Sequence, residues 1–383
     1  MKPDKFVLPQ MGWNSYCTVN CDPTEEFIMK SADVLVQTGL AAAGYVYVNI
    51  DDGWLESDRD ASGNLVENRR IFPHGMKFLT DYIHSKGLKA GTYLGCGQYT
   101  YHGDAGTLGH EFEDARRLAE WGFDYLKYDR RVMENDPPRD VIAEYTKMAV
   151  ALKSCGRNIF FGMCEHGTTA PWTWAAAVGN SWRIGEDIRD RWFDEPGECW
   201  GIMQAVDYRA VPAAPYARLG NYNDPDMLVC GLRGQTSWMG AGCTDIEYRS
   251  QFMLWCMLSA PLLIGTNVCN IDRVTLELLT HKGLIEINQD RLCHPAERVR
   301  HEDGKYDVWM RPLSGVRWAV CVLNRSDSPA ELAFTYSDMK LSEKVKMTMT
   351  SVWTGDKLGT FDTKYSETFL PHEAKVYVLE PTF

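Results

Sequence analysis

"EFEDARRLAEWGFDYLKYDRR", residues 111–131, combines a helical pattern and a strand pattern that meet at a single glycine. Residues 111–121 carry apolar side chains at helical spacing, and a glycine directly after such a run typically ends a helix. In residues 125–129 successive side chains alternate, so that Tyr125, Lys127 and Asp129 share one face of a short strand. The stretch therefore predicts an α/β unit whose strand carries a lysine and an aspartate side by side.

The same alternation of strand-like and helical runs continues from residue 7 to about residue 290. Helical spacing recurs in residues 25–40, 136–156, 244–259 and 273–288. The eight strand-like runs lie at residues 7–16, 45–54, 88–97, 124–131, 159–167, 181–188, 217–228 and 260–268. Eight alternating units of this kind predict a (β/α)₈ TIM barrel. A doubly wound open sheet is the main rival, but no GxGxxG motif follows the first run.

The pattern changes after about residue 294. Residues 306–324, 331–337, 345–355 and 374–381 are short alternating runs between turn residues, without a helical stretch. They predict an antiparallel β-sandwich. We therefore expect two domains, a barrel over residues 1–293 and a C-terminal β-sandwich over residues 294–383.

Composition excludes several classes of partner. The chain of 383 residues has a formal net charge of −12 and no basic tract, so its surface repels phosphate backbones and nucleic acid is not expected to bind. The 12 cysteines are irregularly spaced, without paired CxxC motifs or a Cys/His cluster. Cys17 and Cys21 are close enough in sequence for a disulfide, which is not expected without an oxidising compartment.

Neither a signal peptide nor a membrane segment is recognisable. Residues 1–16 have no apolar core of a signal peptide, which favours a cytoplasmic location over secretion with the signal already removed. The longest apolar run, residues 252–264, contains Pro261 and is too short to span a membrane, so no membrane partner is expected. The sequence does not specify an oligomeric state.

Charged side chains gather where the predicted strands end, which is where a (β/α)₈ barrel places its active site. A single carboxylate there can be a helix N-cap, but a set at the same end of several strands forms a site. The charged residues at these ends are Asp51, Asp52, Lys127, Asp129, Glu165, Arg183, Glu186, Asp187, Asp224 and Asp226, and the accompanying aromatic residues are Trp13, Tyr16, Trp54 and Tyr93.

These residue types favour a sugar over a metal ion. The acids lack the spacing of a divalent-cation site and few histidines lie near, so no metal or other cofactor is expected. Carboxylates accept hydrogen bonds from sugar hydroxyls, and two of them can cleave a glycosidic bond, one attacking the anomeric carbon and the other protonating the leaving oxygen. Asp129 is the expected nucleophile. We expect Lys127, on the same face, to keep it ionised and to donate to a sugar hydroxyl.

The chain resembles glycoside hydrolase family 27, the retaining α-galactosidases and α-N-acetylgalactosaminidases, from about residue 10 to INQD near residue 290. The motifs, in family order, are MGWNSY (11–16), NIDDGW (49–54), IFPHGMKFLTDYIHSKGLKAGTY (71–93), LKYD (126–129), WRIGEDI (182–188) and NDPDML (223–228). The resemblance implies a barrel followed by a β-sandwich. It also implies a retaining exo-glycosidase acting on terminal α-D-galactosides of oligosaccharides or glycoconjugates.

By this resemblance, Asp129 corresponds to the catalytic nucleophile and Asp187 to the acid/base, with Glu186 as the nearest competitor. Glu165 corresponds to a position near the sugar C2 substituent, where galactosidases carry Glu and galactosaminidases carry small residues. The substrate-binding positions correspond to Tyr16, Asp51, Asp52, Tyr93, Lys127, Glu165, Arg183 and Asp226.

Three motifs depart from the family pattern. The family's YDNC is YDRR at residues 128–131, which removes a cysteine that is usually disulfide-bonded. YSDAG is YLGCG at residues 93–97, and CEWG is CEHG at residues 164–167. By strand alternation at most one of Arg130 and Arg131 faces the pocket mouth, where it can donate to a polar or anionic leaving group. The other is expected to be solvated or ion-paired.

Several alternatives stay open at this point. A β-L-arabinopyranosidase is one, because that sugar is galactose without its hydroxymethyl group, and an α-N-acetylgalactosaminidase is another. A non-catalytic sugar-binding barrel belongs to a different class, but the presence of both Asp129 and Asp187 argues against it. A barrel for sugar phosphates needs a Gly-rich anion site after its last strands, where this chain has the acidic NDPDML.

Overall fold

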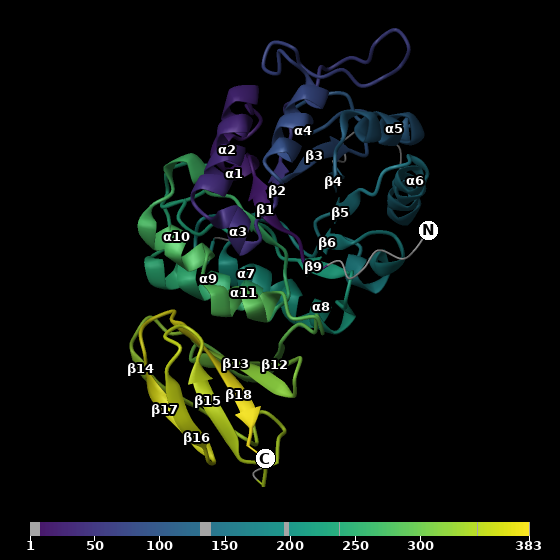
Figure 1. Ribbon diagram of the computed structural model, residues 1–383. Helices are drawn as coiled ribbons and strands as arrows, with labels where there is room; N and C mark the ends of the chain where they lie inside the picture. The colour runs from purple at the N-terminus through teal and green to yellow at the C-terminus, as the bar shows by residue number, and fades with distance from the viewer. Residues whose placement is uncertain (1–7, 131–138, 195–198, 237, 343, 383) are drawn as a thin grey trace. The chain divides into compact units, whose positions relative to one another are not determined.

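The computed structural model describes residues 8–130, 139–194, 199–236, 238–342 and 344–382 (Figure 1). Contacts divide the chain into two compact units. The first unit consists of Gln10–Asp187 and Leu263–Ile271. The second consists of Ile188–Leu262 and Asp272–Phe383, with the described end of Met1–Pro9.

Eight short strands form one sheet in the order β10-β1-β2-β3-β4-β5-β6-β9. Each strand lies within one of the eight runs expected from the sequence, which confirms the predicted barrel strands. The pairs from β1–β2 to β5–β6 are all parallel. The strands are β1 (Met11–Asn14), β2 (Tyr47–Asn49), β3 (Lys89–Gly95), β4 (Tyr125–Asp129), β5 (Phe160–Cys164), β6 (Ser181–Arg183), β9 (Tyr222–Asp224) and β10 (Leu262–Ile264).

Several helix ends of the first unit lie at recognisable signals. Thr24 caps α2 by accepting a hydrogen bond of 3.3 Å from the backbone N of Phe27, and Asp140 caps α6 in the same way. The helix α5 ends at Gly122, whose φ of 92° is the left-handed conformation that glycine adopts without strain. The helices are α1 (Tyr16–Val19), α2 (Glu25–Gln37), α3 (Leu40–Ala43), α4 (Met76–Ser85), α5 (Glu111–Trp121) and α6 (Val141–Ser154).

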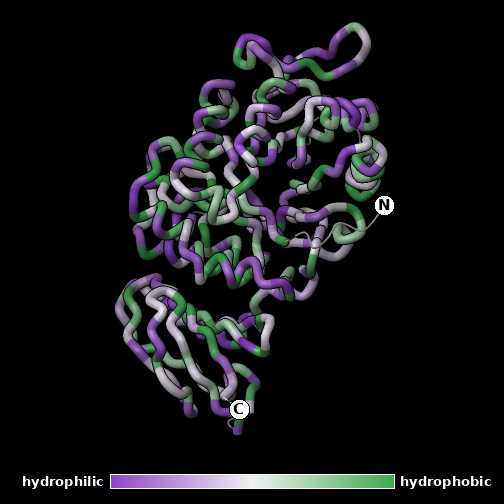
Figure 2. The backbone as a smooth tube through the Cα atoms, in the orientation of Figure 1, coloured by the Kyte–Doolittle hydropathy of each residue, from purple (hydrophilic) through white to green (hydrophobic). Residues whose placement is uncertain are grey.

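The connection between β5 and β6 differs from the expected β/α rhythm. Only two 3₁₀ turns, at Pro171–Thr173 and Ala175–Ala177, lie between these strands. Pro171 fits the first turn of such a helix but cannot continue one. Along α2, α4 and α5, hydrophilic and hydrophobic stretches alternate (Figure 2), as expected for helices that bury one face.

In the second unit the sequence predicted one helix over residues 273–288, but the structure has two. The first ends at Leu279, and His281 then caps the next by accepting a hydrogen bond of 3.3 Å from the backbone N of Leu284. A side chain that satisfies a free backbone N–H starts a new helix there. The elements before the C-terminal sheets are β7 (Asp187–Ile188), β8 (Cys199–Trp200), α7 (Ile202–Ala205), α8 (Val211–Ala213), α9 (Asp245–Met257), α10 (Arg273–Leu279) and α11 (Lys282–Asn288).

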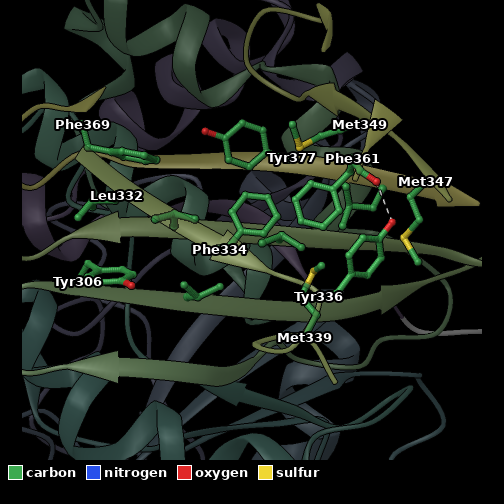
Figure 3. Close-up of a cluster of buried hydrophobic side chains, with 14 residues drawn as sticks. Tyr306, Leu332, Phe334, Tyr336, Met339, Met347, Met349, Phe361, Phe369 and Tyr377 are labelled. Atoms are coloured by element: carbon green, nitrogen blue, oxygen red, sulfur yellow. Dashed lines mark hydrogen bonds between the residues drawn. The ribbon is translucent and has the colours of Figure 1, made fainter. Parts of the chain in front are cut away.

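The C-terminal strands are antiparallel, as predicted, and form a six-stranded sheet of order β11-β12-β13-β18-β15-β16 and a two-stranded sheet β14-β17. Their core is aromatic: Phe334 stacks on Phe361 at 5.2 Å, and the hydroxyl of Tyr336 donates to the carbonyl of Phe361 at 2.9 Å (Figure 3). The strands are β11 (Glu297–Glu302), β12 (Tyr306–Leu313), β13 (Arg317–Asn324), β14 (Ala330–Thr335), β15 (Met347–Ser351), β16 (Lys357–Phe361), β17 (Lys364–Phe369) and β18 (Ala374–Pro381).

All 12 cysteines lie in the described part of the chain and are free thiols, including Cys17 and Cys21. Among the described residues, no helix has both the length and the apolar character that crossing a membrane requires.

Candidate active site

Asp129 ends β4, and both of its carboxylate oxygens have hydrogen-bond partners. Its Oδ1 accepts the backbone N–H of Arg130 at 2.7 Å and lies 3.2 Å from Nε2 of His166. Its Oδ2 accepts the hydroxyl of Tyr93 at 3.0 Å. Burial raises the pKa of Asp129, but the hydrogen bond and charge of His166 and the charge of Lys127 lower it by more. The carboxylate is therefore held ionised in a buried place.

Lys127 lies next to Asp129 on the strand but pairs with Asp51. Its Nζ is 2.9 Å from Oδ2 of Asp51 and lies over the rings of Tyr16 and Tyr93, at 5.5 and 5.3 Å from their centroids. Burial lowers the pKa of Lys127, but its acidic neighbours raise it well above the ordinary value. Lys127 thus helps to keep Asp129 ionised, as expected, but His166 lowers the pKa of Asp129 more than Lys127 does.

Asp51 and Asp52 follow β2 and are oriented mainly by backbone and polar groups. Oδ2 of Asp51 accepts from Nδ2 of Asn14 at 2.7 Å, and Oγ of Ser15 accepts the backbone N–H of Asp51 at 3.0 Å. Oδ2 of Asp52 accepts the backbone N–H of His102 at 2.8 Å. Burial raises the pKa of Asp52 to about 6. Asn14, Ser15 and His102 were not among the predicted residues.

Glu165 follows β5 and is 2% exposed. Its Oε2 accepts hydrogen bonds from Thr168 Oγ1 at 2.6 Å and from the backbone N and the hydroxyl of Thr169 at 3.0 and 2.9 Å. Its Oε1 is buried and has no hydrogen-bond partner among the described residues. Burial raises the pKa of Glu165 although the two threonines donate to it. Because buried polar atoms are almost always hydrogen-bonded, Oε1 is an acceptor suited to a ligand hydroxyl.

Arg183 and Asp187 form an ion pair beyond the end of β6. Nη2 of Arg183 lies 2.9 Å from Oδ1 of Asp187, and it also donates to the carbonyl of Gly185 at 3.2 Å. The side chain of Asp187 is 46% exposed, whereas that of Arg183 is 4% exposed. Burial raises the pKa of Asp187, but Arg183 and His166 lower it by more. Asp187 is therefore the accessible carboxylate of the set.

His166 is the main residue that the sequence analysis missed. Its Nδ1 lies 3.4 Å from Oε2 of Glu186 and 3.9 Å from Oδ1 of Asp187, on the side of the ring opposite to Asp129. Burial lowers the pKa of His166, but Cys164, Asp129 and Glu186 raise it well above its usual value. The signal was present in the sequence, because CEHG carries a histidine where the family motif has tryptophan.

Arg130 is the ion-paired arginine of the YDRR segment. Its Nε lies 3.1 Å from Oε2 of Glu144 on α6, and Arg139 binds the other oxygen of Glu144 at 2.7 Å. Arg131 lies outside the described residues. The role proposed for an arginine at the pocket mouth therefore does not fall to Arg130 in this arrangement.

Asp226, the last predicted site residue, belongs to the second unit. Its Oδ2 accepts the backbone N–H of Ile188 and its Oδ1 that of Met227, both at 2.8 Å. Its φ of 87° is unusual for a residue with a side chain and is frequent at functional sites. Its role toward a substrate stays a prediction.

Asp129, Cys164 and His166 bring one donor atom each within 4.8 Å of one another, the arrangement among described residues closest to a metal site. To bind a metal ion, a histidine must be a neutral imidazole and a cysteine must be a thiolate. Here burial raises the pKa of the Cys164 thiol, and His166 is a cation that donates to Asp129. Without a metal, the trio consists of an ion pair between His166 and Asp129 beside the Cys164 thiol.

The first unit thus brings together the predicted residues of β2 to β6. It offers an ionised buried carboxylate, an accessible carboxylate beside an arginine, and several oriented acceptors near two tyrosines. This set can form a covalent bond to an electrophilic carbon, exchange a proton with an adjoining oxygen, and bind the hydroxyls of a polyol.

Two family models match the chain. One, described as Alpha galactosidase A, matches residues 8–290, and the other, described as Alpha galactosidase C-terminal beta sandwich domain, matches residues 303–379. An alpha-galactosidase of Oryza sativa subsp. japonica is 41% identical over 374 residues, which are 97% of this chain and 85% of that relative.

Solved structures of similar proteins cover nearly the whole chain. Alpha-galactosidase I from Mortierella vinacea has a TM-score of 0.92 at 30% identity, covering 99% of this chain and 98% of that chain. The alpha-galactosidase from Saccharomyces cerevisiae with raffinose has a TM-score of 0.91 at 26% identity, covering 98% of each chain.

Proposed function

The chain belongs to the α-galactosidases of glycoside hydrolase family 27, and on this premise we propose that Asp129 and Asp187 carry out its reaction. The family members are retaining glycoside hydrolases, so the reaction is a double displacement on a terminal α-D-galactoside. Asp129 attacks the anomeric carbon while Asp187 protonates the leaving oxygen. Asp187 then removes a proton from the water that releases galactose from Asp129.

The nucleophile assignment rests on the environment of Asp129. A nucleophilic carboxylate must be ionised and held toward the sugar, and three donors hold both of its oxygens: Arg130 N, His166 and Tyr93. Water reaches it poorly, because it is 5% exposed. This buried, ionised carboxylate at the end of β4 is the observation that carries the proposal.

The acid/base assignment rests on the accessibility of Asp187 and its contact with Arg183. A leaving group must reach the acid from outside the sugar pocket, and the half-exposed side chain of Asp187 allows that. In the free enzyme the pKa of Asp187 is lowered, because the effects of Arg183 and His166 outweigh that of burial. A bound substrate displaces water from this carboxyl, and that desolvation favours the protonated acid that the first step needs.

The sugar specificity rests on Glu165. Its free acceptor Oε1 suits the 2-hydroxyl of galactose, whereas an acetamido group at C2 meets the carboxylate sterically and leaves its charge without a donor. Asp51 and Asp52 are proposed to bind the 4- and 6-hydroxyls. An arabinopyranoside lacks the hydroxymethyl group, so it leaves one of these acceptors unfilled.

A panel of p-nitrophenyl glycosides tests this proposal. We expect kcat/KM to be highest for α-galactose, and lower by roughly 100-fold for α-N-acetylgalactosamine. For β-L-arabinopyranose we expect a smaller loss. Glu165→Ala is expected to reduce the difference in kcat/KM between α-galactose and α-N-acetylgalactosamine. The control is Gln10→Ala, which removes the hydrogen bond of Gln10 to Ser181 at the opposite ends of the strands.

The outcomes separate the alternatives. A higher kcat/KM for either of the other two sugars contradicts the specificity and leaves the mechanism intact. Binding of galactose without turnover of any glycoside contradicts the enzymatic proposal and favours a sugar-binding barrel.

We also propose that the barrel ends near residue 293. Support comes from the local structure, because α11 ends at Asn288 and β11, which pairs with β12, begins at Glu297. The two matching family models leave residues 291–302 uncovered.

A further inference from the structure

His166 lies in the turn after β5, with both ring nitrogens facing acidic side chains. Nε2 is 3.2 Å from Oδ1 of Asp129, and Nδ1 is 3.4 Å from Oε2 of Glu186 and 3.9 Å from Oδ1 of Asp187. The ring is 14% exposed. A ring with acceptors on both sides is a donor at both nitrogens, which only the imidazolium form provides.

The backbone of His166 supports a functional reason for this placement. Its φ of 59° is left-handed, a conformation that costs energy for a residue with a side chain and recurs at active sites. Where the family motif reads CEWG, this chain reads CEHG at residues 164–167. The change puts a cation where the family motif has a neutral indole.

We propose that His166 is a positioning residue of the reaction proposed above: its imidazolium anchors Oδ1 of Asp129 and sets the lowest pH at which that carboxylate attacks the sugar. The inference rests on the role proposed for Asp129. It goes further, because it makes the lowest pH of activity depend on one residue that differs from the family motif.

Charged and titratable groups surround His166 from several elements. In direct contact are Asp129 of β4, Cys164 of β5 at 3.8 Å, and Glu186 and Asp187 beyond β6. Glu165, Arg183 and Lys127 act on these groups through their charges, and the phenol of Tyr101 nearby is neutral because burial raises its pKa. The acids outnumber the cations, so the imidazolium is favoured in the resting enzyme.

The expected sign follows from the ionisation that the first step requires. The nucleophile must be ionised, so kcat/KM falls as the pH falls through the pKa of Asp129 in the free enzyme. Burial raises this pKa and His166 lowers it. Removing the charge of His166 therefore raises the pKa of Asp129, and the acid limb of the profile moves to higher pH.

The test measures kcat/KM of the full chain against pH with p-nitrophenyl α-galactoside, for the wild type, His166→Gln and His166→Asn. The glutamine amide reaches the position of Nε2 and keeps a neutral donor to Asp129. The asparagine amide reaches only the position of Nδ1, and asparagine tolerates the left-handed backbone. We expect the acid limb to move up by about one pH unit or more in both variants, as for loss of an opposite charge at this distance.

The plateau above the acid limb separates charge from orientation. We expect His166→Gln to stay within about threefold of the wild type there, whereas His166→Asn loses about tenfold or more because it no longer holds Oδ1 of Asp129. The matched control is His84→Gln, because His84 binds Asp124 at 2.8 Å just before β4 begins. Its pH profile is expected to match the wild type.

An unmoved acid limb in both His166 variants overturns the proposal, whether the plateau falls or not. Circular dichroism and thermal unfolding establish that each variant is folded. A fluorinated galactosyl fluoride that traps the covalent intermediate tests the underlying function separately. Labelled Asp129 with an unmoved acid limb means that only the role of His166 fails, whereas a label on another carboxylate means that the proposed nucleophile fails.

Discussion

An aspartate lies beside a histidine at each end of the strand β4, and the two pairs have different surroundings. Just before the strand, Asp124 accepts hydrogen bonds from His84 on α4 at 2.8 Å, from the backbone N of Ala90 at 3.0 Å and from Arg157 at 2.6 Å. These partners come from three neighbouring elements. Asp124 therefore ties a helix, a strand and a loop together.

At the other end, Asp129 is bound by His166, by Tyr93 and by the backbone N of Arg130. The partners of Asp129 lie close to other carboxylates, whereas the partners of Asp124 connect elements of the fold. The carboxyl ends of the strands carry long loops with polar residues, whereas the amino ends are closed by short connections. The same pair of residue types thus stabilises the fold at one end and, in the reaction proposed above, prepares chemistry at the other.

The largest contrast is expected for Asp129→Ala and Asp124→Ala. Asp129→Ala should lose on the order of 10⁴-fold or more in kcat, because no other group can form the covalent intermediate. Its free energy of unfolding should change little. Asp124→Ala should keep kcat and lose about 2 kcal/mol of unfolding free energy, because it leaves three partly buried donors unpaired. Turnover assays and denaturant unfolding of both variants measure this. A wild-type rate for Asp129→Ala removes it as the nucleophile.

A second contrast concerns Asp187→Ala, at the same end of the sheet as Asp129. We expect a loss on the order of 10³-fold for substrates with poor leaving groups and a much smaller loss for activated aryl galactosides, which need little protonation. Rates on an alkyl and a p-nitrophenyl galactoside measure it.

Glu186→Gln is the matched control, because Glu186 neighbours Asp187 and also contacts His166. A leaving-group dependence that appears in Glu186→Gln and not in Asp187→Ala reassigns the acid/base.

The smallest effect is expected for Arg130→Ala. Although Arg130 follows the nucleophile directly, its partner is Glu144 on α6 at 3.1 Å. We expect kcat/KM for aryl and oligosaccharide galactosides to fall by the same factor of about threefold or less, with roughly 1 kcal/mol lost in stability. Thermal unfolding and rates on both substrate types measure this. If kcat/KM falls only for oligosaccharides, Arg130 contributes to leaving-group binding and belongs to the functional end of β4.

Local patterns in the sequence determined most of the fold. The eight strand runs, the helix end at Gly122 and the antiparallel C-terminal region follow from alternation, helical spacing and capping, which involve neighbours in the chain. The missed strands of the C-terminal region lacked that signal. The strands β11 and β17 are rich in charged and polar residues, and four of the five residues of β16 are exposed, so none shows an apolar alternation.

The residues of the candidate site were predictable from the sequence, but their hydrogen-bond and ion-pair partners were not. The carboxylates stood out because they follow strand-like runs, and motif order named Asp129 and Asp187. That Lys127 pairs with Asp51, and that His166 reaches Asp129, depend on contacts across 76 and 37 residues of sequence. The parallel register sets these contacts, since it places Asp129 opposite Cys164, two residues before His166. Side-chain partners across strands are chosen by that register, which no local pattern contains.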